Sequence, residues 1–206
     1  MGSKERRERE REQRKSHILD TARALLMEKG LNATSINQIA KRSELSIGAI
    51  YFYFKDKEEI FAALQVEGLD LLGQSIRKAM KKGFSPEERI RAIAAAYLQF
   101  SEKHKNYFDI INYFLTSPGT IFPPDLKNEI DSHGNASIFL LAQAVSEGID
   151  AGAFKTVDPR RQAIILWSVF NGIIQLKKLE KTILAADEYR SLYTEALDRF
   201  LDGLRA

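Results

Sequence analysis

The sequence predicts an all-α protein, and three observations support this fold class. Apolar residues recur every three or four positions along most of the chain, and the strict alternation typical of strands is almost absent. The chain has only five prolines, and each lies near an apparent helix boundary. With 206 residues, 44% of them hydrophobic, the chain can form a small helical domain followed by a medium-sized one.

Cap residues and glycines set the boundaries of the expected helices. Gly30 is placed to end the first helix, Thr34 or Ser35 can cap the second, and Ser46 can cap the third. The dipeptide Ser85-Pro86 opens a later helix with an acid at its third position. The expected helices cover residues 15–29, 36–43, 47–54, 57–82, 86–103, 107–115, 125–151, 159–181 and 188–204, with a break left open at His133-Gly134.

Composition excludes several functional classes. The absence of cysteine excludes disulfides, zinc fingers, iron–sulfur clusters and thiol catalysis. Residues 4–15 are charged and lack the apolar segment of a signal peptide, and the longest apolar stretch, residues 163–174, is too short to span a bilayer. We therefore expect a cytoplasmic protein without a membrane partner.

No pattern typical of an enzyme is present. The three histidines are scattered, and the pair Glu129 and His133, four residues apart, does not make a metal site. The sequence has no nucleophile elbow, P-loop or dinucleotide fingerprint. We expect no catalytic residues, no metal and no cofactor.

Positive charge is concentrated at the N-terminus. Residues 1–57 hold 13 Lys/Arg and 8 Asp/Glu, a net charge of +5, whereas the remainder has a net charge of −2. This excess favours a polyanionic partner, although a solvated charged face is an equally common cause. Seven basic and four acidic residues fall within residues 4–15. That segment either extends the first helix through pairs such as Glu10–Arg14, forms an arm that orders in a DNA minor groove, or is a solvated tail.

Residues 34–57 carry the most informative pattern. Two short helices are joined by a tight turn, and the second begins Ser46-Ile47-Gly48-Ala49-Ile50-Tyr51, which is a helix-turn-helix pattern. Small residues at the start of that helix allow a close approach to DNA, and hydroxyl and ammonium groups beyond it can reach phosphates. The apolar set that such a unit needs is Ile36, Ile39, Ala40, Leu45 and Ile50.

Residues 16–61 resemble the TetR-type (tetracycline repressor) family of bacterial regulators. The resemblance rests on Ile18-x3-Ala22, Gly30, Thr34-Ser35-Ile36-x2-Ile39-Ala40 and Ser46-Ile47-Gly48-Ala49-Ile50-Tyr51-x-Tyr53-Phe54-x2-Lys57-Glu58. The turn departs from the family, because Ser43-Glu44-Leu45 stands where Ala-Gly-Val is common. A residue other than glycine in this turn is expected to need a strained backbone conformation.

The resemblance implies a ligand-responsive regulator, and specifically a repressor, which binds a palindromic double-stranded DNA operator. Base-edge contacts are implied for Asn37, Ile47, Gly48 and Ala49, and phosphate contacts for Thr34, Ser35, Ser46, Tyr51, Tyr53 and Lys57. Phe52 stands where the family often has a contact, and the first amides of the fourth helix are implied to face a phosphate. The plainer alternatives are core packing for Ile47 and Tyr51.

The implied organisation is a charged arm over residues 1–15, a DNA-binding domain over residues 16–60, and an effector and dimerisation domain over residues 61–206. Aromatic residues are frequent in the last of these. Most must be core, but a pocket between helices for an apolar or aromatic small-molecule effector is also expected. The candidate lining residues are Tyr97, Phe100, Phe108, Ile111, Asn112, Phe114, Phe139, Gln143, Trp167, Phe170 and Asn171.

The last two helices are implied to form a four-helix bundle with a second copy, giving a homodimer. Their apolar faces, which could also pack within one chain, comprise Ile165, Val169 and Ile173 on one helix and Leu192, Leu197, Phe200 and Leu204 on the other. The alternatives are an activator, a regulator without a ligand, or a helical adaptor that binds protein. Only DNA binding should weaken steeply with salt.

Overall fold

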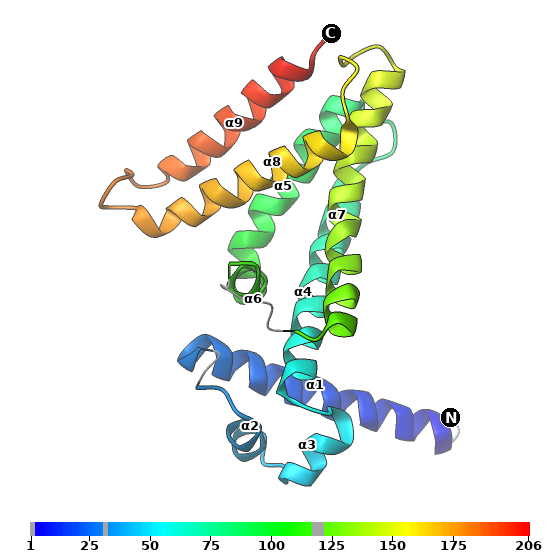
Figure 1. Cartoon of the computed structure of the whole chain (residues 1–206), viewed down its shortest axis with the longest axis vertical. Coiled ribbons are helices and arrows are strands. Elements are labelled where there is room, and N and C mark those ends of the chain that lie inside the picture. Colours follow the sequence, from blue (N-terminus) through cyan, green and yellow to red (C-terminus); the bar gives the residue numbers. More distant parts are fainter. Residues whose placement is uncertain (1–2, 31–32, 117–121) are drawn as a thin grey trace. The chain divides into compact units, whose positions relative to one another are not determined.

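The computed structural model describes residues 3–30, 33–116 and 122–206, which are mainly helical and contain no β-sheet (Figure 1). The all-α prediction is therefore confirmed. The helices are α1 (Ser3–Lys29), α2 (Ile36–Arg42), α3 (Ile47–Tyr53), α4 (Lys57–Ala79), α5 (Pro86–Lys103), α6 (Lys105–Leu115), α7 (Pro124–Asp150), α8 (Pro159–Leu176), the short 3₁₀ helix η1 (Lys177–Leu179) and α9 (Glu188–Leu204). None of these helices is both long and apolar enough to cross a membrane.

The chain folds into two compact units. The first comprises Met1–Leu69 and Asn106–Asp131, and the second comprises Asp70–Lys105 and Ser132–Ala206. This division differs from the expected boundary at residue 60, because Phe61, Leu64 and Phe122 are buried in the same core as the first three helices. Helices α4 and α7 each contribute residues to both units.

The first unit is built around one face of α1. Ile18, Ala22 and Leu25 are buried there against Ile39 of α2 and Ile50 of α3. These apolar residues follow the helical repeat, so a single face of α1 supports the whole helix-turn-helix.

The predicted caps define the ends of these helices. Ser35 caps α2 in a capping box with Gln38, which decides between the two expected cap residues. Gly30, with φ +77°, ends α1, and its amide donates to the carbonyl of Leu26 at 2.9 Å.

The turn between α2 and α3 contains a strained residue, as expected from its lack of glycine. Glu44 has φ 56°, a left-handed conformation that costs a residue with a side chain about 1–2 kcal/mol. Two neighbouring contacts hold the turn. The buried hydroxyl of Ser43 donates to the carbonyl of Ile39 at 2.8 Å, and the His17 ring lies 3.2 Å from the carbonyl oxygen of Ser43.

Several helix boundaries differ from the predictions. Helix α1 begins at Ser3 instead of residue 15, because ion pairs such as Arg6–Glu10 at 2.9 Å extend a helix already nucleated by packing. Of the alternatives for residues 4–15, the helical extension is confirmed. Helix α7 continues through the expected break, where the imidazole of His133 pairs with Asp70 at 2.6 Å. Helices α4 and α8 end earlier than expected, at Ala79 and Leu176.

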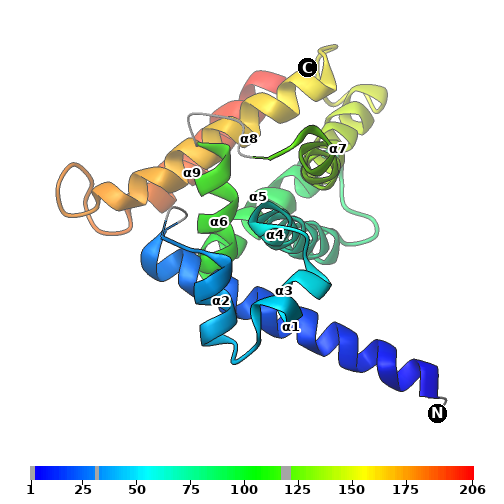
Figure 2. The same cartoon turned by 60° about the horizontal axis from the view of Figure 1, so that its bottom comes forward.

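The second unit is held together by α5, α8 and α9, and both views show α8 and α9 side by side (Figures 1 and 2). The rings of Phe170 and Tyr193 stack with their centroids 4.1 Å apart, and the Tyr193 hydroxyl donates to the carbonyl of Ala94 at 2.8 Å. Arg91 adds an ion pair with Asp198 at 2.6 Å. Half-exposed ion pairs contribute little stability, so the buried aromatic residues dominate this packing.

We expect Gly148→Ala to destabilise the second unit. A Cβ at Gly148 would lie 2.0 Å from Cδ2 of Phe154, so the ring must move. Overpacking of this kind costs about 1–3 kcal/mol, which thermal denaturation followed by circular dichroism will detect as a lower Tm.

The matched control is Gly73→Ala, where the added Cβ meets only the flexible end of Arg77, and its Tm should stay near that of the wild type. Phe154→Leu in the Gly148→Ala background should cost less than Phe154→Leu alone. Equal Tm values for the two alanine variants would contradict the packing described above.

Candidate nucleic-acid interface

Helix α3 has one anchored side and one open side. Ile50 is fully buried and Phe54, its C-cap, is 2% exposed. Around the rest of the helix, Ile47, Tyr51 and Phe52 are 45%, 54% and 72% exposed. Three large exposed side chains on a seven-residue helix form a concentrated patch, which is typical of a surface that binds a partner.

The cap serines retain a free donor for a partner. The Ser46 hydroxyl oxygen accepts from the amide of Ala49 at 3.1 Å, and that of Ser35 accepts from the amide of Gln38 at 3.3 Å. A hydroxyl group has one donor and two acceptor positions, so each proton remains available to a phosphate oxygen. Both serines are exposed, at the starts of the two helices of the motif.

The remaining predicted contact residues, apart from Thr34, are exposed or partly buried. Asn37 and Gly48 are exposed, Ala49 and Tyr53 are partly buried, and the ammonium of Lys57 lies 5.7 Å from the centroid of the Phe61 ring.

The phosphate contact predicted for Thr34 does not agree with the position of its side chain. It is only 1% exposed, and its hydroxyl donates to the carbonyl of Gly30 at 2.8 Å, so the side chain stabilises the loop after α1 rather than facing a phosphate.

The start of α4 is also less open to a phosphate than implied. The amide of Glu59 donates to the carboxylate of Asp56 at 2.8 Å, and the amide of Lys55 donates to the carboxylate of Glu59. One first-turn amide is therefore already satisfied by an anion. Two carboxylates at this position repel DNA phosphates.

Two ion pairs that orient the motif were missed from the sequence. Arg42 of α2 donates twice to the carboxylate of Glu28 of α1, at 2.5 and 2.7 Å, and this hydrogen bonding lowers the pKa of Glu28. Arg23 of α1 lies 3.2 Å from Glu67 of α4. The partners are 14 and 44 residues apart, so only the fold brings them together.

The predicted effector residues are divided between the two units. Phe108, Ile111, Asn112 and Phe114 belong to the first unit, where Phe114 packs between the rings of Phe61 and Phe122 at centroid distances of 5.9 and 4.9 Å. The Asn112 side-chain amide donates to the carbonyl of Phe108 at 2.8 Å. Packing thus explains these residues within their own unit.

The second unit contains a buried cluster and an open groove. Tyr97, Phe100 and Phe170 are buried, burial raises the pKa of Tyr97, and Trp167 is partly buried. The side-chain nitrogen of Asn171 is buried with no hydrogen-bond partner among the residues that the structure describes. An unpaired buried donor is costly, so this atom is a candidate contact for a ligand.

Phe139 and Gln143 lie apart from that cluster, contrary to the prediction of a single pocket. Phe139 is 67% exposed, and both residues line an open groove of about 550 Å³. The other residues of the groove are Asn135, Ile138, Ala142, Ser146, Asp158, Pro159 and Arg160, on α7 and at the start of α8.

Helix α8 presents an apolar face that its own unit does not cover. Ile165 is 45% exposed and Val169 is 40% exposed, as expected for a dimer surface. The prediction was wrong for Leu197 and Leu204 of α9, which are buried inside the unit. Leu192, Phe200 and Ile173 are partly buried.

Within the described ranges, no three side chains of the metal-binding types are grouped as a metal site. His133, which the sequence paired with Glu129, contacts Asp70 instead.

Comparisons with known proteins agree with this arrangement. Residues 18–64 match the family of bacterial regulatory proteins described as tetR, and residues 90–200 match the tetracyclin repressor-like C-terminal domain. The HTH-type transcriptional regulator YhgD of Bacillus subtilis is 25% identical over 161 residues, which are 78% of this chain and 82% of that protein.

Two further matches come from the same organism. The fatty acid metabolism regulator protein of Bacillus subtilis is 22% identical over 138 residues, covering 67% of this chain and 69% of that protein. The crystal structure of the regulator FadR from Bacillus subtilis in complex with stearoyl-CoA has a TM-score of 0.76 and 19% identity, covering 91% of this chain and 98% of that one.

Both family matches fall on the helices described above, and the C-terminal match alone spans more than half of the chain. The chain therefore belongs to the TetR family of transcriptional regulators, DNA-binding proteins with a helix-turn-helix and a helical ligand-binding domain, and it is not an enzyme.

Proposed function

We propose that this regulator is a repressor that binds a palindromic operator as a homodimer and is released by an apolar small molecule. The observation that carries the DNA-binding part is the open surface of α3, where Ile47, Tyr51 and Phe52 are exposed while Ile50 anchors the helix in the core. We assign DNA binding to residues 16–60, and effector binding and dimerisation to residues 61–206.

The chemistry of the exposed side chains suggests which of them contact base edges and which contact phosphates. Ile47 can contact a thymine methyl group, Asn37 can form paired hydrogen bonds with adenine, and Gly48 and Ala49 allow close approach to the base edges. The hydroxyl groups of Ser35, Ser46, Tyr51 and Tyr53 and the ammonium of Lys57 suit phosphate oxygens, which fix position without reading sequence. Phe52, which is 72% exposed, is assigned a contact with the sugar–phosphate backbone.

We expect Tyr51→Phe to weaken operator binding without changing sequence preference, because a phosphate contact carries no base information. Operator sequences come from selection of bound duplexes from random DNA, and fluorescence anisotropy then compares the selected operator with single-base variants. Ile47→Ala should instead change the preference at one or two base pairs, each by about 1–3 kcal/mol.

Tyr113→Phe on α6, which alters another exposed tyrosine, serves as the control. It should leave operator affinity and sequence preference unchanged. Altered preference with unchanged overall affinity in Tyr51→Phe would contradict its assignment to phosphate.

The dimer proposal rests on the exposed α8 face. A second copy would bury Ile165 and Val169, and Gly172 on the same helix has no atom within 4 Å of where its Cβ would be, which leaves room for a close approach. Two-fold symmetry would give each half of a palindrome one α3, and the two must lie about 34–36 Å apart to enter successive major grooves.

We expect Ile165→Glu to convert the dimer to a monomer, because it places a charge in an apolar interface. Sedimentation velocity at micromolar concentration measures the change, and operator affinity should fall with it. Ile183→Glu, at a side chain that is 74% exposed in the segment between η1 and α9, is the control. A wild-type protein that stays monomeric both free and on DNA would refute the symmetric arrangement.

The effector proposal rests on the side-chain nitrogen of Asn171, which is buried without a hydrogen-bond partner among the described residues, in a unit that also buries several aromatic side chains. An amide N–H suits the carbonyl oxygen of a mostly apolar ligand. A relative is named as a fatty acid metabolism regulator and a similar structure holds stearoyl-CoA, so we take acyl compounds as the first candidates. Helix α4 belongs to both units and is the candidate route by which the ligand acts on α3.

We expect Asn171→Leu to raise the Tm of the free protein, since it removes an unsatisfied buried donor worth about 1–3 kcal/mol, and to weaken ligand coupling. Stearate and stearoyl-CoA are titrated against free protein and against the operator complex. For wild type the two affinities should differ by about 5–150-fold, because coupling is reciprocal.

Gln143→Leu, which alters an exposed amide in the groove, is the matched control. It should change neither the Tm of the free protein nor the coupling between ligand and operator. Equal ligand affinities with and without operator would show that these compounds are not inducers. A lowered Tm with intact coupling in Asn171→Leu would remove Asn171 from the effector site.

A further inference from the structure

The N-terminal part of α1 extends beyond the helices that it supports. Helix α1 has 27 residues, but its first core residue is Ile18, and the described side chains of residues 4–14 are all exposed. Figures 1 and 2 both show this end of α1 projecting past α2 and α3. Packing of the first unit does not require it, so its charges call for another explanation.

The cations of this extension fall into two sets on different faces. Arg7, Arg11 and Arg14 are spaced by four and three residues, and the same spacing continues into the core residues Ile18 and Ala22. The three arginines therefore form a stripe in line with the face of α1 that packs against the helix-turn-helix. Lys4 extends this stripe by one turn.

Ion pairing distinguishes the stripe from the other face. Arg6 pairs with Glu10 at 2.9 Å, and Arg9 also has an interaction partner. In the described part of the chain, no ion pair joins Arg7, Arg11 or Arg14 to another side chain. The expected Glu10–Arg14 pair is not formed, because Glu10 pairs with Arg6 instead. The stripe thus keeps its charge for an external anion.

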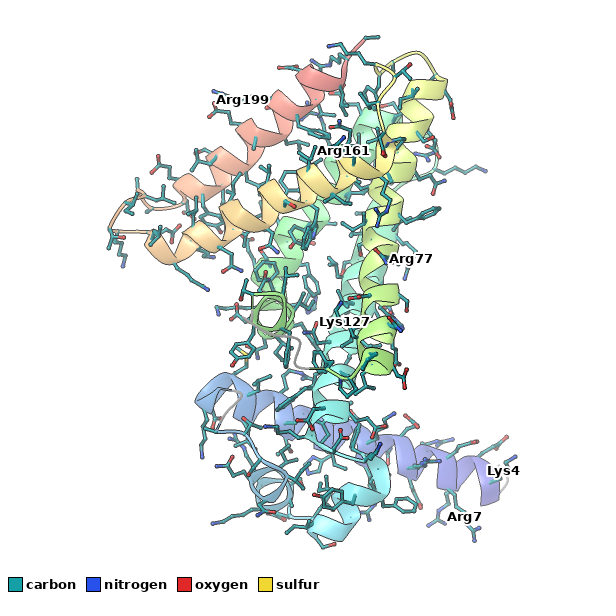
Figure 3. The ribbon with its side chains drawn as sticks, viewed as in Figure 1. Lys4, Arg7, Arg77, Lys127, Arg161 and Arg199 are labelled. Atoms are coloured by element: carbon teal, nitrogen blue, oxygen red, sulfur yellow. The ribbon has the colours of Figure 1, made fainter. Side chains whose placement is uncertain are left out.

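Two contacts show that the stripe is directed toward the DNA-reading side of the first unit. On one flank, the His17 ring lies 3.2 Å from the carbonyl oxygen of Ser43 in the turn. On the other flank, the ammonium of Lys15 lies 5.7 Å from the centroid of the ring of Phe54, the C-cap of α3. In Figure 3, Arg7 extends from α1 on the side where α3 lies.

We propose that Arg7, Arg11 and Arg14 bind DNA phosphates that flank the base pairs read by α3, so that each α1 extends the footprint of its own helix-turn-helix. The inference rests on the proposed DNA-binding function. Residues 7–14 cover roughly 10 Å along a helix, so the backbone positions of the three arginines are fixed before DNA binds. Guanidinium–phosphate hydrogen bonds are charge-assisted and independent of sequence.

The test compares two double variants with equal changes of charge on the same helix. Arg7→Gln/Arg11→Gln alters the stripe, and Arg6→Gln/Arg9→Gln alters the paired face. Each protein is titrated over a range of salt concentrations with two duplexes, one ending at the selected operator and one longer by about a helical turn on each side. Circular dichroism confirms that both variants keep the helix.

We expect the stripe variant to bind the longer duplex roughly tenfold or more weakly, with a salt slope smaller by about three to four for a dimer that loses four phosphate contacts. The paired-face variant should bind like wild type, and on the short duplex the two variants should differ little. Equal losses in both variants, or an unchanged salt slope in the stripe variant, would overturn the inference. Wild-type protein that binds neither duplex would overturn the proposed function itself, which is a separate outcome.

Discussion

The attachment of α3 to α1 is the constraint on which the DNA-facing surface depends. Ile50 and Phe54 are buried in the core that Ile18 and Ala22 of α1 create, and this burial fixes which side of a seven-residue helix faces outward. A helix this short has little stability of its own, so its exposed residues keep their positions only while that core is intact. The burial of Ile50 therefore determines the orientation of Ile47 and Tyr51.

The turn between α2 and α3 shows how the fold compensates for an unfavourable local sequence. Glu44 adopts a left-handed conformation that glycine would adopt at no steric cost. The hydroxyl of Ser43 and the ring of His17 hold the backbone just before the strained residue. Just after it, the amide of Leu45 donates to the carbonyl of Ala40 at 3.0 Å. His17 stood in the sequence only as one of three scattered histidines, and its role depends on a residue 26 positions away.

The elements of the motif could be predicted because their signals are local. Cap serines, a glycine after α1 and apolar residues at helical spacing lie within a few positions of the features that they determine. Thr34 was misassigned because its partner, the carbonyl of Gly30, competes with any phosphate, and no spacing rule shows this. The effector residues could not be resolved, because an aromatic residue in a core and one in a pocket have the same sequence pattern. Their division between two units depends on long-range packing.

Three features that we assign to binding do not stabilise the single chain. The nitrogen of Asn171 is buried without a partner, Ile165 and Val169 are exposed on α8, and the arginines of the α1 stripe lie without ion pairs among the described residues. Three other buried atoms, Arg23 Nε, Asn112 Oδ1 and Ser137 Oγ, also have no hydrogen-bond partner among the described residues. A buried unpaired donor costs about 1–3 kcal/mol, which is a large share of the stability of a typical domain. An unpaired group alone does not identify a partner, so each assignment also depends on its setting: a ligand carbonyl for the amide in an aromatic-rich unit, a second copy for the apolar face of α8, and DNA phosphates for the arginines in line with the helix-turn-helix.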